Sequence, residues 1–169
     1  MSPHDGPRSR PGFLVVAILV AIALLAALWY VRRLPGALPV DELIGRLKSG
    51  TPIEQTAAAE GLGKLGDPAA VDPLIAALAA KEWSLRRAAA LALGQLHDGR
   101  AVGPLTQRLE DDNVWVVIES AQALAKIGDA SAVEPLEKRL KAEQKKKKDQ
   151  QNTDLLTHIE TAIKTLKSK

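Results

Sequence analysis

The feature that most constrains the fold is a segment of 17 residues that returns twice, each time 31 residues further along the chain. Its three copies read LGKLGDPAAVDPLIAAL at residues 62–78, LGQLHDGRAVGPLTQRL at residues 93–109 and LAKIGDASAVEPLEKRL at residues 124–140. A fixed period of this length is typical of proteins that stack one small structural unit repeatedly. Seven columns are identical in all three copies, and in the first copy they are Leu62, Asp67, Ala70, Val71, Pro73, Leu74 and Leu78.

The register of the repeat extends beyond the three copies on both sides. Residues 40–48 match the second half of a unit, because three of their apolar residues fall 31 positions before identical columns of the first copy. Residues 152–166 match residues 113–127 once eight additional residues are allowed within the lysine-rich stretch 141–150. We therefore expect a repeat domain over residues 40–166 that begins with a half-unit and ends with a closing helix.

Each unit has the sequence pattern of two antiparallel helices, because apolar residues recur at three- and four-residue spacing. Gly66 and Gly128 are placed to end the first helix in a left-handed conformation, and His97 occupies the same column. The aspartate that follows each of them is placed to cap the second helix. The proline column that begins at Pro73 predicts a short tight turn before the main part of that helix. One hairpin leaves an apolar face bare, so the units must stack to bury it.

The segment GDPAAVDPL at residues 66–74 resembles the signature of HEAT-like repeats, in particular the short units found in phycobilisome lyases and many bacterial proteins. The units are shorter than ordinary HEAT units, and the family's Val-Arg pair in the first helix survives as Leu85-Arg86. The resemblance implies an all-α, right-handed α-solenoid that binds proteins. It also implies that the second helices line the concave side, through Asp72, Ala76, Gln107, Arg108 and Lys138.

An unbroken apolar run, FLVVAILVAIALLAALWYV, precedes the repeats at residues 13–31 and holds no charge, proline or glycine. As a helix it would be about 28 Å long, close to the ~30 Å thickness of a bilayer's hydrocarbon core. Trp29 and Tyr30 suit the interface, and Arg32 and Arg33 suit the headgroup layer. We therefore expect one transmembrane helix. The alternative is a cleavable signal peptide, but the bulky end of this run is unlike a cleavage site.

A span at this place leaves a tail of residues 1–12 before it and a linker of residues 32–39 after it. Arg8 and Arg10 precede the span and two arginines follow it, so the Lys/Arg count does not fix its orientation. A short tail before a large domain favours transfer of that domain across the membrane. The predicted location is the bacterial inner membrane, in a single pass, with the repeat domain on the extracytoplasmic side.

Composition argues against several function classes. Residues 37–140 carry 11 basic against 15 acidic residues, a net charge of −4, which is unlike a nucleic-acid-binding surface. The chain has no cysteine, and none of its three histidines precedes a glutamate. The HEAT-like enzyme deoxyhypusine hydroxylase, by contrast, holds its iron with His-Glu pairs. By register, His97-Asp98 is a pair of helix caps. We therefore predict no catalytic residue, no metal ligand, no cofactor and no enzymatic activity.

The candidate partner surface centres on two tryptophans. Trp83 and Trp115 open the first helices of successive units, and tryptophan is frequent among the residues that dominate binding energy. The alternative is that each packs on the neighbouring repeat. Arg86 and Arg87 follow within one turn, and they either face the partner or pair with acids such as Asp67 across the stack. The predicted surface comprises Trp83, Trp115, Arg86, Arg87, Gln107, Arg108 and Lys138.

Four consecutive lysines, Lys145, Lys146, Lys147 and Lys148, lie in the inserted stretch. Such a run is either a solvated loop or a contact with anionic lipid headgroups. No aromatic residue interleaves with the lysines, which is unlike a site that stacks nucleic-acid bases.

The sequence as a whole predicts a membrane-tethered, non-catalytic HEAT-like scaffold that binds a protein partner. One alternative is an enzyme on the same repeat, either metal-dependent or similar to the phycobilin lyases, which bind an open-chain tetrapyrrole. A lipid-surface binding module is the other alternative. Neither the partner's identity nor the oligomeric state follows from the residues.

Overall fold

The structure is a computed structural model that describes residues 39–168. The chain divides into two compact units, Met1–Pro39 and Val40–Lys169, and the helices described below belong to the second. Within residues 39–168, no helix combines the length and the apolar character that crossing a bilayer requires. The predicted span at residues 13–31 lies outside the described residues.

Every regular element in residues 39–168 is helical, so the all-α prediction is confirmed for this part of the chain. A typical unit consists of a long α-helix, a short 3-10 turn and a shorter α-helix. The α-helices are α2 (Val40–Ser49), α3 (Pro52–Leu65), α4 (Val71–Ala77), α5 (Trp83–Leu96), α6 (Val102–Arg108), α7 (Val114–Ile127), α8 (Val133–Gln144) and α9 (Thr153–Lys167). The 3-10 turns are η1 (Pro68–Ala70), η2 (Gly99–Ala101), η3 (Ala130–Ala132) and η4 (Lys148–Gln150).

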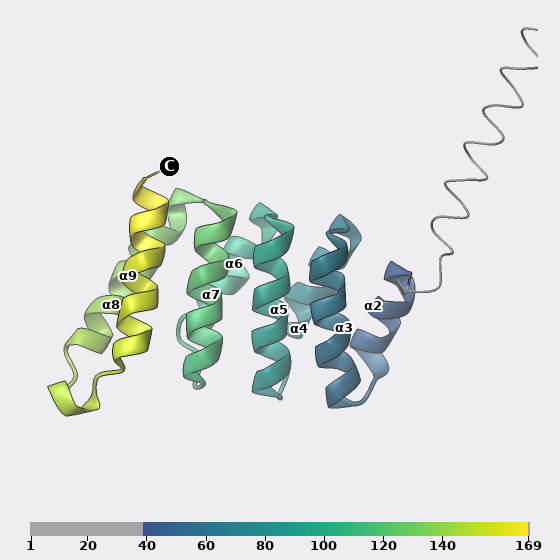
Figure 1. The fold of residues 1–169 in the computed structure, drawn as a ribbon, viewed down its shortest axis with the longest axis horizontal. Coiled ribbons are helices and arrows are strands. Elements are labelled where there is room, and N and C mark those ends of the chain that lie inside the picture. Colours follow the sequence, from purple (N-terminus) through teal and green to yellow (C-terminus); the bar gives the residue numbers. More distant parts are fainter. Residues whose placement is uncertain (1–38, 169) are drawn as a thin grey trace, which may run out of the picture. The chain divides into compact units, whose positions relative to one another are not determined.

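The long helices α3, α5, α7 and α9 pack side by side in chain order (Figure 1). Helix α2 packs on α3, and α4, α6 and α8 form a second row in which each packs on the long helix that follows it. Because each short helix returns the chain, the four long helices run in the same direction. Their N-terminal ends therefore lie along one edge of the stack, which is the lower edge in Figure 1.

The turns between the two helices of a unit have the predicted caps. Gly66, His97 and Gly128 end their helices with positive φ angles of 70°, 52° and 86°. The aspartate that follows each of them accepts the backbone N–H two residues further on, at 2.8–2.9 Å. Among the described residues, His97 is the one non-glycine residue with positive φ. Its Nδ1 donates to the carbonyl oxygen of Lys126 at 2.9 Å, so the imidazole ties one unit to the next.

The identical leucine columns form the core of the stack. Fully buried leucines occupy the same places in three units, and truncation of such a side chain to alanine typically costs about 2–5 kcal/mol. These leucines are Leu62, Leu93 and Leu124 from the long helices, and Leu74, Leu105 and Leu136 from the short ones.

Small residues set the spacing of the long helices. A Cβ atom on Gly63 would lie 2.8 Å from the Cα of Ala92, and one on Gly94 would lie 2.8 Å from the Cα of Ala123. Both distances are below ordinary contact, so α3–α5 and α5–α7 approach as closely as they do because glycine stands there. The third unit has Ala125 in this column, so α9 meets a methyl group where α5 and α7 meet none.

Candidate functional site

Arg86, predicted to face a partner or to pair within the stack, lies inside the stack with 8% of its surface exposed. Its Nε and Nη2 donate to both carboxylate oxygens of Asp111, at 2.8 and 2.7 Å. Nη2 also donates to Asp112 at 2.6 Å, and Nη1 donates to the carbonyl oxygens of Ala80 and Lys81. The guanidinium thus joins the loop before α5 to the loop before α7.

The acid that pairs with Arg86 is therefore Asp111, and not Asp67 as the sequence suggested. Burial raises the pKa of the Asp111 carboxyl. The hydrogen bonds from Arg86 and from the backbone N–H of Asn113 outweigh that effect and hold the pKa below its ordinary value. Asp111 is consequently an ionised, buried structural group.

A second arginine column forms repeated links between units. Arg108 donates from Nη1 to the carbonyl oxygen of Leu78 at 3.2 Å. Arg139, 31 residues later, donates from Nε to the carbonyl oxygen of Leu109 at 2.9 Å. Arg108 was predicted to face a partner, but the structure gives its guanidinium this bond to the preceding unit. Sequence reasoning missed Arg139, although the shared spacing of the two arginines and the two leucines was visible.

Glu143 holds the inserted stretch and was also missed. Its side chain is 1% exposed, accepts the backbone N–H of Asn152 at 3.0 Å, and pairs with Lys146 at 2.7 Å and Arg139 at 3.2 Å. Burial opposes its ionisation, but these three donors lower the pKa of Glu143 below its ordinary value. Lys146 is thereby tied to the end of α8 rather than extended into solvent.

Trp83 and Trp115 lie at the first turns of α5 and α7 and are 42% and 50% exposed. Ile53, at the first turn of α3, is 83% exposed. All three side chains belong to the edge formed by the N-terminal ends of the long helices. We call this edge, with the loop of residues 145–148 at its end, the tryptophan edge.

The predicted residues on the second helices lie along a groove. Gln107 and Lys138 are exposed, on α6 and α8. A hollow of about 240 Å³ between the two helices is lined by Thr106, Leu109, Glu110, Glu134, Pro135 and Lys138. A second hollow of about 590 Å³ is lined by Glu134, Glu137, Lys138, Lys141, Ala142 and Lys145. Because the hollows share Glu134 and Lys138, they adjoin, and we call them together the α8 groove.

The first two predicted residues of the same helix row lie further along the stack. Asp72, on α4, is exposed and pairs with Arg100 at 3.0 Å. Ala76 is exposed on the same helix. The proposal that these residues line a concave side stays a prediction.

Another hollow, of about 410 Å³, separates α7 from α9 at the place where Ala125 replaces glycine. Gln122 donates from Nε2 to Nδ1 of His158 across it, at 3.0 Å. Glu119 lies one turn before Gln122, and burial raises its pKa, an effect opposed by the charges of Lys126, Arg87 and His158. Arg87 is thus part of a surface row of charges. The hollow is lined by Gln122, Ala125, Lys126, His158, Thr161, Ala162 and Thr165.

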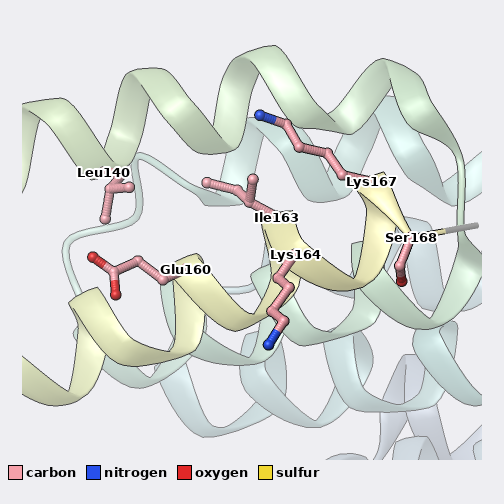
Figure 2. A pocket seen from close by; sticks show the side chains of 6 residues that line it. All are labelled: Leu140, Glu160, Ile163, Lys164, Lys167 and Ser168. Carbon is pink, nitrogen blue, oxygen red and sulfur yellow. The ribbon is translucent and has the colours of Figure 1, made fainter.

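A hollow of about 400 Å³ lies between α8 and α9, towards the C-terminal end of the stack (Figure 2). Leu140 and Ile163 give it an apolar floor, and Glu160 and Lys164 project from α9 at its rim. Lys167 reaches across to Glu137 of α8 at 2.6 Å. Within residues 39–168, no three His, Asp or Glu side chains are grouped in a way that could hold a metal ion.

The stacked hairpins, their shared caps and the repeated arginine links define an α-solenoid of short repeats. A family model described as HEAT repeats matches residues 18–90, 40–122 and 71–149. These matches together extend over residues 18–149, well over half of the chain, so the chain belongs to the HEAT-repeat family.

Solved structures show the same fold. The structure of the complex of CpcE and CpcF of phycocyanin lyase from Nostoc sp. PCC7120 is similar with a TM-score of 0.64 and 31% sequence identity, over 78% of this chain and 57% of that chain. The crystal structure of an engineered protein is similar in fold, with a TM-score of 0.58 and 22% identity, over 76% of this chain and 62% of that chain. The chain thus spans less than two thirds of either. A search of the curated proteins finds no match.

Proposed function

We propose that this HEAT-repeat chain is a non-catalytic scaffold that binds a protein partner through the α8 groove and is held at a membrane by residues 13–31. The observation that carries the proposal is the groove itself. Its two adjoining hollows, of about 240 and 590 Å³, run along one face of α8. Glutamates and lysines alternate on that face, which suits a partner with complementary charges.

The interior supports a scaffold because its charged groups serve structural roles. Arg86, Arg139 and Glu143 are each committed to hydrogen bonds that join neighbouring helices or loops. A stack fixed in this way presents its groove in one shape, which reduces the entropy lost on binding. The similar solved structure is a complex of two chains, and this favours a protein as the partner here.

The test is affinity capture from detergent-solubilised membranes, with Lys138→Glu as the variant and Lys64→Glu as the matched control. Lys138 lines both hollows, whereas Lys64 is exposed on α3, away from the groove. We expect Lys138→Glu to lose the captured partner and Lys64→Glu to retain it. Equal capture by both variants would contradict the groove, provided that both melt like the parent chain.

The membrane tether is tested separately. We expect the chain to remain in the membrane fraction after carbonate or high-salt washing, because nineteen apolar residues outweigh what a wash can remove. Release by salt alone would refute a span, and a mature N-terminus after Ala27 would identify a signal peptide. Protease added to intact spheroplasts should digest the repeats if they lie outside the cytoplasm, as we propose, and protection would place them inside.

The second candidate is a lyase subunit, favoured by the 31% identity to a chain of the phycocyanin lyase complex. On this reading the chain would act with a second protein on an open-chain tetrapyrrole. The probe is biliverdin added to the purified chain, followed by absorbance spectroscopy. A shifted and saturable absorbance band would support this candidate, and an unchanged spectrum would favour the scaffold.

A further inference from the structure

The tryptophan edge differs from the α8 groove in shape and in composition. Helical side chains lean towards the N-terminus, so residues in a first turn project beyond the end of their helix. Ile53, Trp83 and Trp115 occupy first turns of α3, α5 and α7, which run in the same direction side by side. Their apolar tips therefore form a row along one edge of the stack.

The row is spaced by the packing of the helices. Neighbouring axes in such stacks lie about 8–10 Å apart, so the three tips extend over roughly 20 Å. None of the four hollows described above is lined by Ile53, Trp83 or Trp115. A row of exposed apolar tips without a hollow suits a flat surface better than a protruding part of a protein partner.

Cations lie at the α9 end of the same edge. Lys146 is bound to Glu143, but Lys145, Lys147 and Lys148 form no ion pair with any described residue. The loop that carries them precedes α9, whose N-terminal end lies on the same edge as those of α5 and α7 (Figure 1). Lysines near an anionic surface are attracted to it within about 8 Å at physiological ionic strength.

Several acidic groups near the edge are neutralised within the stack. Asp111 and Asp112 pair with Arg86, and Glu143 pairs with Lys146. The exposed Glu82 and Glu110 beside the tryptophans form no ion pair in the described part of the chain, so the cationic character is concentrated at the loop. Attraction to anions and insertion of apolar tips are thus supplied by different parts of one edge.

We propose that the tryptophan edge binds the surface of a phospholipid bilayer that contains anionic headgroups. Trp83 and Trp115 enter the interfacial layer, where indole rings are favoured. Lys145, Lys147 and Lys148 contact the anionic headgroups. This contact goes beyond the proposed scaffold function, and it leaves the α8 groove available to a partner.

The experiment uses the full chain with Trp29→Phe, so that both remaining tryptophans lie on the edge. The purified protein is reconstituted in vesicles of phosphatidylcholine alone, or of an equal mixture with phosphatidylglycerol, each containing doxyl-labelled lipid as a quencher. We expect a shift of tryptophan emission to shorter wavelength, and quenching, in the mixed vesicles. Phosphatidylcholine alone should leave the emission unquenched, and high salt should reverse most of the effect.

Charge variants identify the residues responsible. The triple variant Lys145→Gln, Lys147→Gln, Lys148→Gln should lose the quenching in mixed vesicles. The control removes the same charge from Lys64, Lys126 and Lys164, which lie towards the C-terminal ends of long helices. It should be quenched as strongly as the parent chain.

Three outcomes would overturn the proposal. They are unquenched tryptophans in mixed vesicles, equal quenching in the two lipid compositions, and equal loss in both triple variants. Tryptophans that are shielded only after addition of a membrane-free protein extract would assign the edge to a protein and would also overturn it. Because the purified system contains no partner, the result does not depend on the α8 groove.

Discussion

Replacement of Arg86 by methionine removes the side chain with the most buried polar contacts described above. Five hydrogen bonds disappear, to Asp111, Asp112 and the carbonyl oxygens of Ala80 and Lys81. The side chain of Asp111 is 3% exposed, so its carboxylate stays buried without its cation. Removal of one partner from a buried ion pair costs about 3–5 kcal/mol, and we expect Arg86→Met to lower the free energy of unfolding by this amount.

The chain offers a matched control in the second acid bound by the same guanidinium. The side chain of Asp112 is 90% exposed, although it lies only 2.6 Å from Arg86. An exposed ion pair contributes about 0–1 kcal/mol, so Asp112→Asn should cost no more than that. The two variants alter one network but differ in the burial of the group that is left behind.

The assay is urea unfolding of the parent and variant chains, followed by far-UV circular dichroism. Equal denaturant slopes would show that the change in midpoint reports stability. A loss below about 1 kcal/mol for Arg86→Met, or equal losses for both variants, would refute the reasoning from burial.

The pH dependence gives an independent check with a definite sign. Burial raises the pKa of Asp111, but Arg86 and the Asn113 N–H lower it more, so the folded pKa lies below the ordinary value of 3.8. The stability gained from Asp111 is therefore present above pH 3.8 and is lost as the pH falls through the folded pKa. In Arg86→Met burial still raises the pKa, while the main opposing hydrogen bonds are gone. The destabilisation by this variant should therefore be smaller near about pH 3 than at neutral pH.

Three further predictions concern the repeat domain. A chain that begins at residue 37 should give a helical circular dichroism spectrum, because stacked units bury their own core, and a coil spectrum would contradict this. Asp98→Ala should lower stability by about 0.5–2 kcal/mol through loss of the cap on η2, measured by urea unfolding. Gly94→Ala should cost about 1–3 kcal/mol, because its Cβ would lie 2.8 Å from the Cα of Ala123. Unchanged stability in Gly94→Ala would show that α5 and α7 can separate freely.

The helices and their caps were predictable because they depend on local chemistry repeated in register. A left-handed residue followed by a capping aspartate needs only two neighbours, and Gly66-Asp67 recurs with its period of 31. Even His97 could be assigned to a cap, because its column identified the required conformation. Its bond to the Lys126 carbonyl could not be foreseen, since it joins residues from different units.

The networks that hold the candidate surfaces were harder to predict because their partners lie in loops. Arg86 reaches Asp111 across 25 positions, to a residue with no identical counterpart in the other units. Glu143 belongs to the inserted stretch, where no second copy exists for comparison. Exposure of the tryptophans was also open, because Trp83 and Trp115 are 32 residues apart and so do not share a column. Their burial depends on the depth of each loop, which periodicity does not encode.

The most direct measurement of the central claim is site-specific photo-crosslinking in living cells. A photoreactive amino acid replaces Gln107 or Lys138, which lie on α6 and α8 beside the α8 groove, or Thr157, which is exposed on α9. The account predicts that the same protein is crosslinked from both groove positions and is absent from position 157. Crosslinks of equal yield at all three positions, or no crosslink at either groove position, would contradict it.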